Sequence, residues 1–110
     1  LCMSEAFKEM YDVIVNRRDD PQEGSYTCYL FDKGLDKILK KCGEECTEMV
    51  IAAKNHDNEE LANEINDVLY HMAVLMVERG LTVEEVDAIM RERSKKIGNL
   101  KQFHVSDHNT

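Results

Sequence analysis

The pattern of apolar and polar residues along the chain predicts four helices. Apolar residues at helical spacing, followed by two arginines, predict a helix over 4–18 with Ser4 as its N-cap. Further apolar stripes predict helices over 33–55, 58–79 and 83–96. One proline and five glycines leave few positions that would interrupt them. The pattern is typical of an all-α protein.

Capping signals divide the second half of the chain. Asp57, followed three residues later by Glu60, forms a capping box for the third helix, and Gly80 ends that helix. Thr82 and Glu85 form the capping box of the fourth. Because only the short turn NHDN separates the second and third helices, they must form an antiparallel hairpin.

Two segments fall outside this pattern. Residues 19–32, DDPQEGSYTCYLFD, hold the only proline, and their apolar spacing is too irregular for a helix, so they predict a long connection of the kind that is often functional. The 110 residues suffice for one domain, which we assign to 1–96. Residues 97–110 are expected to form a tail that is poorly ordered unless a partner holds it.

The apolar stripes also predict how the helices assemble. On the second helix the residues that fall within roughly 60° of one line, and so form a core stripe, are Leu35, Ile38, Leu39, Cys42, Cys46, Met49, Val50 and Ala53. On the third helix, VLYHMAVLMV (68–77) is apolar on nearly every side. A helix of this kind must be buried all round, which predicts a bundle of about four helices per chain completed by dimerisation.

Charge and composition narrow the class of function. The net charge of -8, from 14 basic and 22 acidic residues, argues against nucleic acid or an anionic membrane as partner. The longest apolar run, MAVLMV, is far too short to span a membrane. Four cysteines without the spacing of a disulfide scaffold, and no secretory segment, predict reduced thiols and a cytoplasmic protein.

Four acids are expected to converge on one side of the hairpin. Glu45 and Glu48 lie about 80° and 140° to one side of the core stripe, on its flank. Glu64 and Asp67 lie on the matching flank of the third helix, and Glu48 and Glu64 are at almost the same height above the turn. If the two flanks share one side of the hairpin, E-x-x-E faces E-x-x-D.

The mutual repulsion of four clustered carboxylates must be offset. Two like charges about 4 Å apart repel by roughly 4 kcal/mol at an effective dielectric constant near 20. The acids must therefore spread into water as ordinary surface, stay protonated, or bind a cation. Ligands that are all oxygens favour Mg²⁺ or Mn²⁺ over zinc. A di-iron site would place Glu-x-x-His on its helices, whereas His71 lies four residues after Asp67, so that site is less favoured.

The sequence around these acids resembles a known family. GSYTCYLFDKGLDKILKKCGEECTEMVIAAKN, followed by ELANEINDVLYHMAVLMVERGLT, is similar to the phosphoribosyl-ATP pyrophosphohydrolases of histidine biosynthesis, a branch of the MazG-like all-α NTP pyrophosphatases. The E-x-x-E and E-x-x-D motifs are shared by the whole superfamily, and the SYT..LF..G.DKILKK.GEE block narrows the resemblance to this branch. It covers roughly residues 24–93.

The resemblance implies Mg²⁺-dependent hydrolysis of phosphoribosyl-ATP to phosphoribosyl-AMP and pyrophosphate by a homodimer or larger assembly. Glu45, Glu48, Glu64 and Asp67 match the catalytic, metal-binding acids of the superfamily. Glu44, the first acid of the GEE block, points nearly opposite the core stripe, so its role stays open.

Several further residues are candidates for binding the substrate. The lysines near the acids could hold the polyphosphate or could be ordinary exposed residues; they are Lys33, Lys37, Lys40, Lys41 and Lys54. Lys41 is the best placed, because it shares the flank of Glu45 and Glu48. Tyr26, with Ser25 and Thr27, matches the SYT block and could contact the substrate or pack the segment. His71 could orient Asp67, touch phosphate, or be a partly buried structural residue.

Two other functions remain open at this point. A MazG-like enzyme acting on free (d)NTPs would carry the same four acids. A non-catalytic acidic helical dimer that binds a basic partner would show the same charge and the same apolar stripes.

Overall fold

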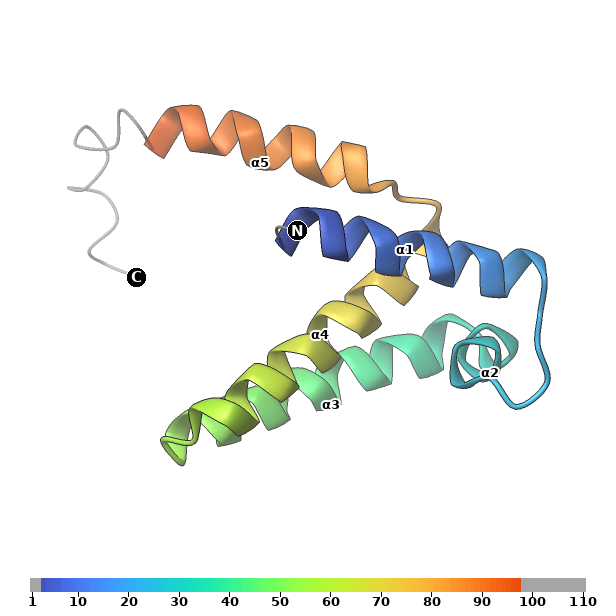
Figure 1. The fold of residues 1–110 in the computed structure, drawn as a ribbon, viewed down its shortest axis with the longest axis horizontal. Helices are drawn as coiled ribbons and strands as arrows, with labels where there is room; N and C mark the ends of the chain where they lie inside the picture. Colours follow the sequence, from blue (N-terminus) through green and yellow to red (C-terminus); the bar gives the residue numbers. More distant parts are fainter. Residues whose placement is uncertain (1–2, 98–110) are drawn as a thin grey trace.

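The computed structural model describes residues 3–97, which form five helices and no strand. The helices are α1 (Met3–Asp19), α2 (Tyr26–Lys33), α3 (Leu35–Lys54), α4 (Asn58–Arg79) and α5 (Val83–Ile97). α3 and α4 lie side by side as an antiparallel hairpin, and α1 packs on α4 near the end of that helix (Figure 1). The all-α prediction is confirmed, with one helix more than predicted. None of these five helices combines the length and the apolar character that a membrane span needs.

The additional helix is α2, where the sequence predicted only a connection. The Ser25 side chain caps α2 by accepting a hydrogen bond from the Cys28 backbone N–H at 3.3 Å. Thr27 and Leu30 are buried, so the short helix is stabilised by its cap and its packing. Gly34, at φ 91°, separates α2 from α3, and the helix predicted to begin at residue 33 therefore begins at Leu35.

The core lies where α1, α2 and α3 meet the second half of α4. It is formed by Tyr11, Ile14, Leu30, Ile38, Ala73, Val74, Met76 and Val77. The contribution of α4 is the largest, as its apolar sequence predicted. Ser4, predicted as the N-cap of α1, lies within the first turn instead, because the helix already begins at Met3.

The ends of α4 are those predicted from the sequence. The Asp57 side chain accepts a hydrogen bond from the Glu60 N–H at 3.1 Å, which caps the start of the helix. Gly80 ends it in the left-handed conformation, at φ 71° and ψ 24°.

Gly80→Ala is expected to lower the free energy of unfolding by about 1–2 kcal/mol, because a Cβ strains a left-handed residue. A Cβ at Gly80 would have no atom within 4 Å, so the cost would be conformational and not steric. Gly43→Ala is the matched control: Gly43 also has open space around its Cβ position but lies inside α3, where alanine should stabilise by about 0.5–1 kcal/mol. Urea unfolding of both variants checks the prediction, and effects of the same sign would contradict it.

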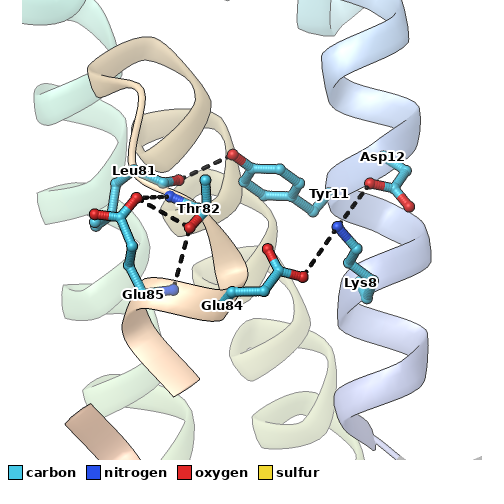
Figure 2. Close-up of polar contacts among 7 residues, drawn as sticks. All are labelled: Lys8, Tyr11, Asp12, Leu81, Thr82, Glu84 and Glu85. Carbon is cyan, nitrogen blue, oxygen red and sulfur yellow. Dashed lines mark hydrogen bonds and ion pairs between the residues drawn. The ribbon is translucent and has the colours of Figure 1, made fainter. Parts of the chain in front are cut away.

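α5 is tied to the rest of the chain at its first turn (Figure 2). Thr82 and Glu85 form the predicted capping box, with the Glu85 N–H donating to Thr82 Oγ1 and the Thr82 N–H donating to Glu85 Oε1, each at 3.1 Å. The Tyr11 hydroxyl donates to the Leu81 carbonyl at 2.9 Å, and Lys8 Nζ lies 3.5 Å from Glu84 Oε2. No residue of α5 is buried.

The predicted core stripe of α3 is only partly correct. Ile38 is buried, but Leu39 and Val50 are 45% and 57% exposed, and Cys46 and Ala53 are exposed as well. The buried residues of α3 are Ile38, Glu45 and Ala52. α4 therefore packs against the acidic flank and not against the centre of the stripe, which the apolar pattern alone could not indicate.

The structure of the single chain does not bury α4 all round. Met72 and Ile65 are exposed on this helix, as Leu39, Val50 and Ile51 are on α3. The dimer therefore stays a prediction, as does the domain boundary at residue 96. Of the predicted tail, Ile97 ends α5, and the remainder lies outside the described residues.

Candidate metal centre

Three carboxylates meet between the two helices of the hairpin. α3 supplies Glu45 and Glu48, one turn apart, and α4 supplies Glu64. One oxygen from each lies within 4.8 Å of the others. The charge of Asp67, one turn further along α4, acts on both Glu45 and Glu64. The two acidic flanks thus lie on the same side of the hairpin.

Part of this cluster is withdrawn from water. Glu45 is buried, Glu64 is half-buried and Glu48 is exposed. Glu45 Oε2 and Glu64 Oε2 are buried and have no hydrogen-bond partner among the described residues. Leaving carboxylate oxygens buried and unpaired is costly, so the cluster needs a proton or a cation.

The pKa shifts follow from this crowding. Burial raises the pKa of Glu45, and the adjacent Glu48 and Asp67 raise it further. Burial, the proximity of Glu60 and the charge of Glu48 raise the pKa of Glu64 to about 7. In the absence of a cation, the cluster therefore retains a proton close to neutral pH.

The donor set fits a hard divalent cation. All the converging ligand atoms are carboxylate oxygens, as Mg²⁺ and Mn²⁺ prefer. A cation among them would supply the partner that the two buried oxygens lack and would offset the mutual repulsion of the acids.

Lys41 lies at the edge of the cluster. Its Nζ is 3.6 Å from Glu45 Oε1 and 3.5 Å from Glu44 Oε1. Burial opposes the charge of this lysine, but Tyr26, Glu44 and Glu45 together raise its pKa, so the ammonium is retained. The side chain of Glu44 is 46% exposed and pairs with Lys41 instead of joining the other acids.

His71 connects the cluster to α2. The ring is buried, and its Nδ1 donates to the Asp67 carbonyl oxygen at 2.8 Å. In the neutral ring, Nε2 then accepts a hydrogen bond from the Tyr26 hydroxyl at 3.0 Å. The neighbouring pair, Thr27 Oγ1 and the Tyr70 hydroxyl, is also hydrogen-bonded. Both nitrogens of His71 form hydrogen bonds inside the protein, and the bond from Nε2 orients Tyr26.

The other predicted lysines lie apart from the acids. The Nζ atoms of Lys33 and Lys37 lie 5.8 and 6.0 Å from the ring centre of Tyr29. Lys40 and Lys54 are exposed, and within the described part of the chain neither forms an ion pair with the cluster. Tyr29 is not among the candidates predicted from the sequence, although its position in the aromatic run YTCYLF, beside Tyr26, could have indicated it.

The helices and the site define a class: an all-α protein with a carboxylate cluster suited to a divalent cation in a helical hairpin. The family model described as phosphoribosyl-ATP pyrophosphohydrolase matches residues 7–94. The chain belongs to this family, which confirms the resemblance drawn from its motifs.

Relatives in several bacteria support the assignment. The chain is 58% identical over 91 residues to the phosphoribosyl-ATP pyrophosphatase of Streptococcus thermophilus, covering 83% of this chain and 88% of that protein. It is 52% identical over 99 residues to the protein of that name in Streptococcus sanguinis, covering 90% and 95%. Over 79 residues it is 61% identical to the histidine biosynthesis bifunctional protein HisIE of Thermoanaerobacter pseudethanolicus, covering 72% of this chain and 37% of that longer protein.

Proposed function

We propose that the chain hydrolyses phosphoribosyl-ATP to phosphoribosyl-AMP and pyrophosphate in the biosynthesis of histidine, in the cytoplasm. The reaction breaks the anhydride bond between the α- and β-phosphates and adds water across it. Family membership supports the substrate. The observation that carries the chemistry is the cluster of Glu45, Glu48 and Glu64, with its buried, unpaired carboxylate oxygens.

The proposal assigns Mg²⁺ to the cluster, with Mn²⁺ as the alternative. Glu45, Glu48 and Glu64 would hold the cation, and Asp67 would be the fourth acid of the site. When bound, a divalent cation neutralises charge on phosphate oxygens and makes a bound water more acidic.

Residues around the cluster have separate tasks in this proposal. The Lys41 ammonium, held by Glu44 and Glu45, offers positive charge to phosphate oxygens beside the acids. Tyr26, held by His71, forms the wall of the site on the side of α2. Lys33 and Lys37 lie at the ring of Tyr29 and not at the acids.

The active form in this proposal is a homodimer or a larger assembly. Support comes from the apolar side chains that the single chain leaves exposed on α3 and α4, among them Leu39, Val50 and Met72. A second copy of the hairpin would cover such residues. Sedimentation equilibrium of the full chain tests this part of the proposal.

A substrate panel tests the reaction itself. Phosphoribosyl-ATP, ATP and the dNTPs are each incubated with the protein and Mg²⁺, and the products are separated by anion-exchange chromatography. We expect phosphoribosyl-AMP and pyrophosphate from phosphoribosyl-ATP, with little turnover of the others. Faster hydrolysis of dNTPs would favour the (d)NTP pyrophosphatase alternative, and no hydrolysis of any nucleotide would favour the non-catalytic helical dimer.

A further inference from the structure

A pocket lies where the loop after α1 meets α2. Its volume is about 500 Å³, and the residues that line it include Gln22, Gly24, Ser25, Tyr26, Tyr29 and Asp32. This volume is within the range of small-molecule sites in proteins. Apart from Tyr26, none of these residues has a role in the carboxylate cluster.

Two tyrosines give the pocket an aromatic wall. The ring centres of Tyr26 and Tyr29 are 6.1 Å apart with 24° between the ring planes, and the residues are 45% and 40% exposed. Tyr26 is also stacked on Tyr70 at 6.3 Å and hydrogen-bonded to His71. Partly exposed aromatic rings that are held in place by such contacts are a suitable surface for a planar heterocyclic base.

Two lysines outside the lining of the pocket lie at the ring of Tyr29, which forms part of its wall. The Nζ atoms of Lys33 and Lys37 lie 5.8 and 6.0 Å from the centre of the Tyr29 ring. Neither lysine forms an ion pair within residues 3–97, although the chain has 22 acids against 14 basic residues. Two unpaired ammonium groups at one ring repel each other and favour an anion between them, such as a phosphate.

Tyr26 connects the pocket with the residues beside the carboxylate cluster. This residue lines the pocket, and its hydroxyl is bonded to His71, one turn beyond Asp67 on α4. Lys41, which is paired with Glu45, is close enough for its charge to act on the Tyr26 hydroxyl. A ligand with its anhydride at the acids could therefore extend along α2 into the pocket.

We propose that this pocket is the subsite for the phosphoribosyl-adenine part of the substrate, with the base against Tyr29 and the phosphate of the phosphoribosyl arm held by Lys33 and Lys37. This inference rests on the proposed function, because it takes phosphoribosyl-ATP as the substrate. The arm with its phosphate is what distinguishes that molecule from ATP. The two lysines would therefore determine specificity, whereas the carboxylate cluster acts on the anhydride that both molecules share.

Binding of the product tests the proposal without turnover. Isothermal titration calorimetry with phosphoribosyl-AMP, and with AMP as the probe that lacks the second phosphate, is applied to the double variant Lys33→Met/Lys37→Met. We expect phosphoribosyl-AMP to bind about 10- to 100-fold more weakly, as for the loss of charge-assisted hydrogen bonds, with AMP nearly unaffected. The KM for phosphoribosyl-ATP should rise by a similar factor while kcat changes little. Lys96→Met, the same substitution on exposed α5, should bind both nucleotides as the unmodified chain does.

The aromatic wall has its own pair of variants. Tyr29→Leu should weaken the binding of both phosphoribosyl-AMP and AMP by about 5- to 100-fold, which is the effect of losing one base–aromatic stack. Tyr29→Phe keeps the ring and should bind both nucleotides nearly as the unmodified chain does. Circular dichroism of each variant checks that it remains helical.

Two results would overturn the inference: unchanged binding of phosphoribosyl-AMP by the double lysine variant, or an equal loss of affinity for AMP. If the unmodified chain hydrolyses phosphoribosyl-ATP while these variants bind normally, the subsite is wrong and the function stands. If lysine-dependent binding of phosphoribosyl-AMP is measured but no phosphoribosyl-ATP is hydrolysed, the proposed function is wrong and the pocket stands.

Discussion

Replacing Glu48 with glutamine is expected to slow the release of pyrophosphate from phosphoribosyl-ATP by about 100- to 1000-fold. A carboxylate that holds the cation contributes several kcal/mol to the stabilisation of the transition state, and each 1.36 kcal/mol is about tenfold in rate. The amide keeps the size of the side chain but loses its charge. Because Glu48 is exposed, the helical fold should be unaffected, which circular dichroism and thermal unfolding can verify.

Glu44→Gln is the matched control for this prediction. It removes the same charge from the same helix, four residues away, from a side chain that pairs with Lys41 outside the group of three acids. We expect a change of only about twofold, since an exposed ion pair contributes little. If Glu48→Gln stayed active, or if both variants lost activity equally, the assignment of the cation site would be wrong.

Mg²⁺ is expected to stabilise the protein, and more strongly at pH 8 than at pH 5.5. The pKa of Glu64 is raised from 4.5 to about 7 in the folded chain, so between these values the folded state binds more protons than the unfolded state. Without a cation, this carboxyl therefore lowers the free energy of unfolding as pH rises through that window. A cation that replaces the proton therefore binds most tightly at a pH above this window, where the carboxyl is ionised.

Thermal unfolding measures this competition. At a Mg²⁺ concentration about 100-fold above its Kd, binding adds about 2.7 kcal/mol, which raises Tm at pH 8 by on the order of 10 °C for a chain of this size. At pH 5.5 the rise should be much smaller. Glu64→Gln should remove most of the rise at both pH values, and K⁺ at equal ionic strength should not reproduce it. A rise that is independent of pH, or that persists in Glu64→Gln, would show that Mg²⁺ binds elsewhere.

The hairpin of α3 and α4 could be predicted from the sequence because its determinants are local. Asp57 caps α4 through the N–H of Glu60, and Gly80 ends the helix in a conformation that glycine readily adopts. The apolar spacing between these caps is regular. Heights above a short turn then follow from helix geometry, which is how Glu48 and Glu64 could be placed opposite each other.

α2 could not be predicted because it depends on contacts distant in sequence. Its apolar spacing is irregular, and it is held in place by pairs such as Tyr26 with His71 and Thr27 with Tyr70, more than 40 residues apart. For a similar reason the predicted core stripe of α3 does not coincide with the face that α4 covers. Apolar periodicity includes every apolar side chain of the helix, the exposed Leu39 and Val50 among them, and does not indicate which face α4 covers.

The same limit applies to the site. Of the four acids that the sequence grouped, Glu45, Glu48 and Glu64 converge, because E-x-x-E and E-x-x-D fix their faces on two helices of known direction, whereas Asp67 lies outside that group of three. The lysines could not be sorted in this way: Lys41 lies at the acids, Lys33 and Lys37 lie at Tyr29, and Lys40 lies at neither. Lys37, Lys40 and Lys41 all lie on α3, and the break at Gly34 sets the direction of α2 that brings the ring of Tyr29 beside Lys37.

The most direct test of the central claim is the rate of pyrophosphate release from phosphoribosyl-ATP as a function of Mg²⁺ concentration, after removal of metal with a chelator. We expect no release without the cation, a saturable rise as Mg²⁺ is added, and phosphoribosyl-AMP as the other product in equal amount. Release at the full rate in the absence of any divalent cation would contradict the role assigned to Glu45, Glu48 and Glu64.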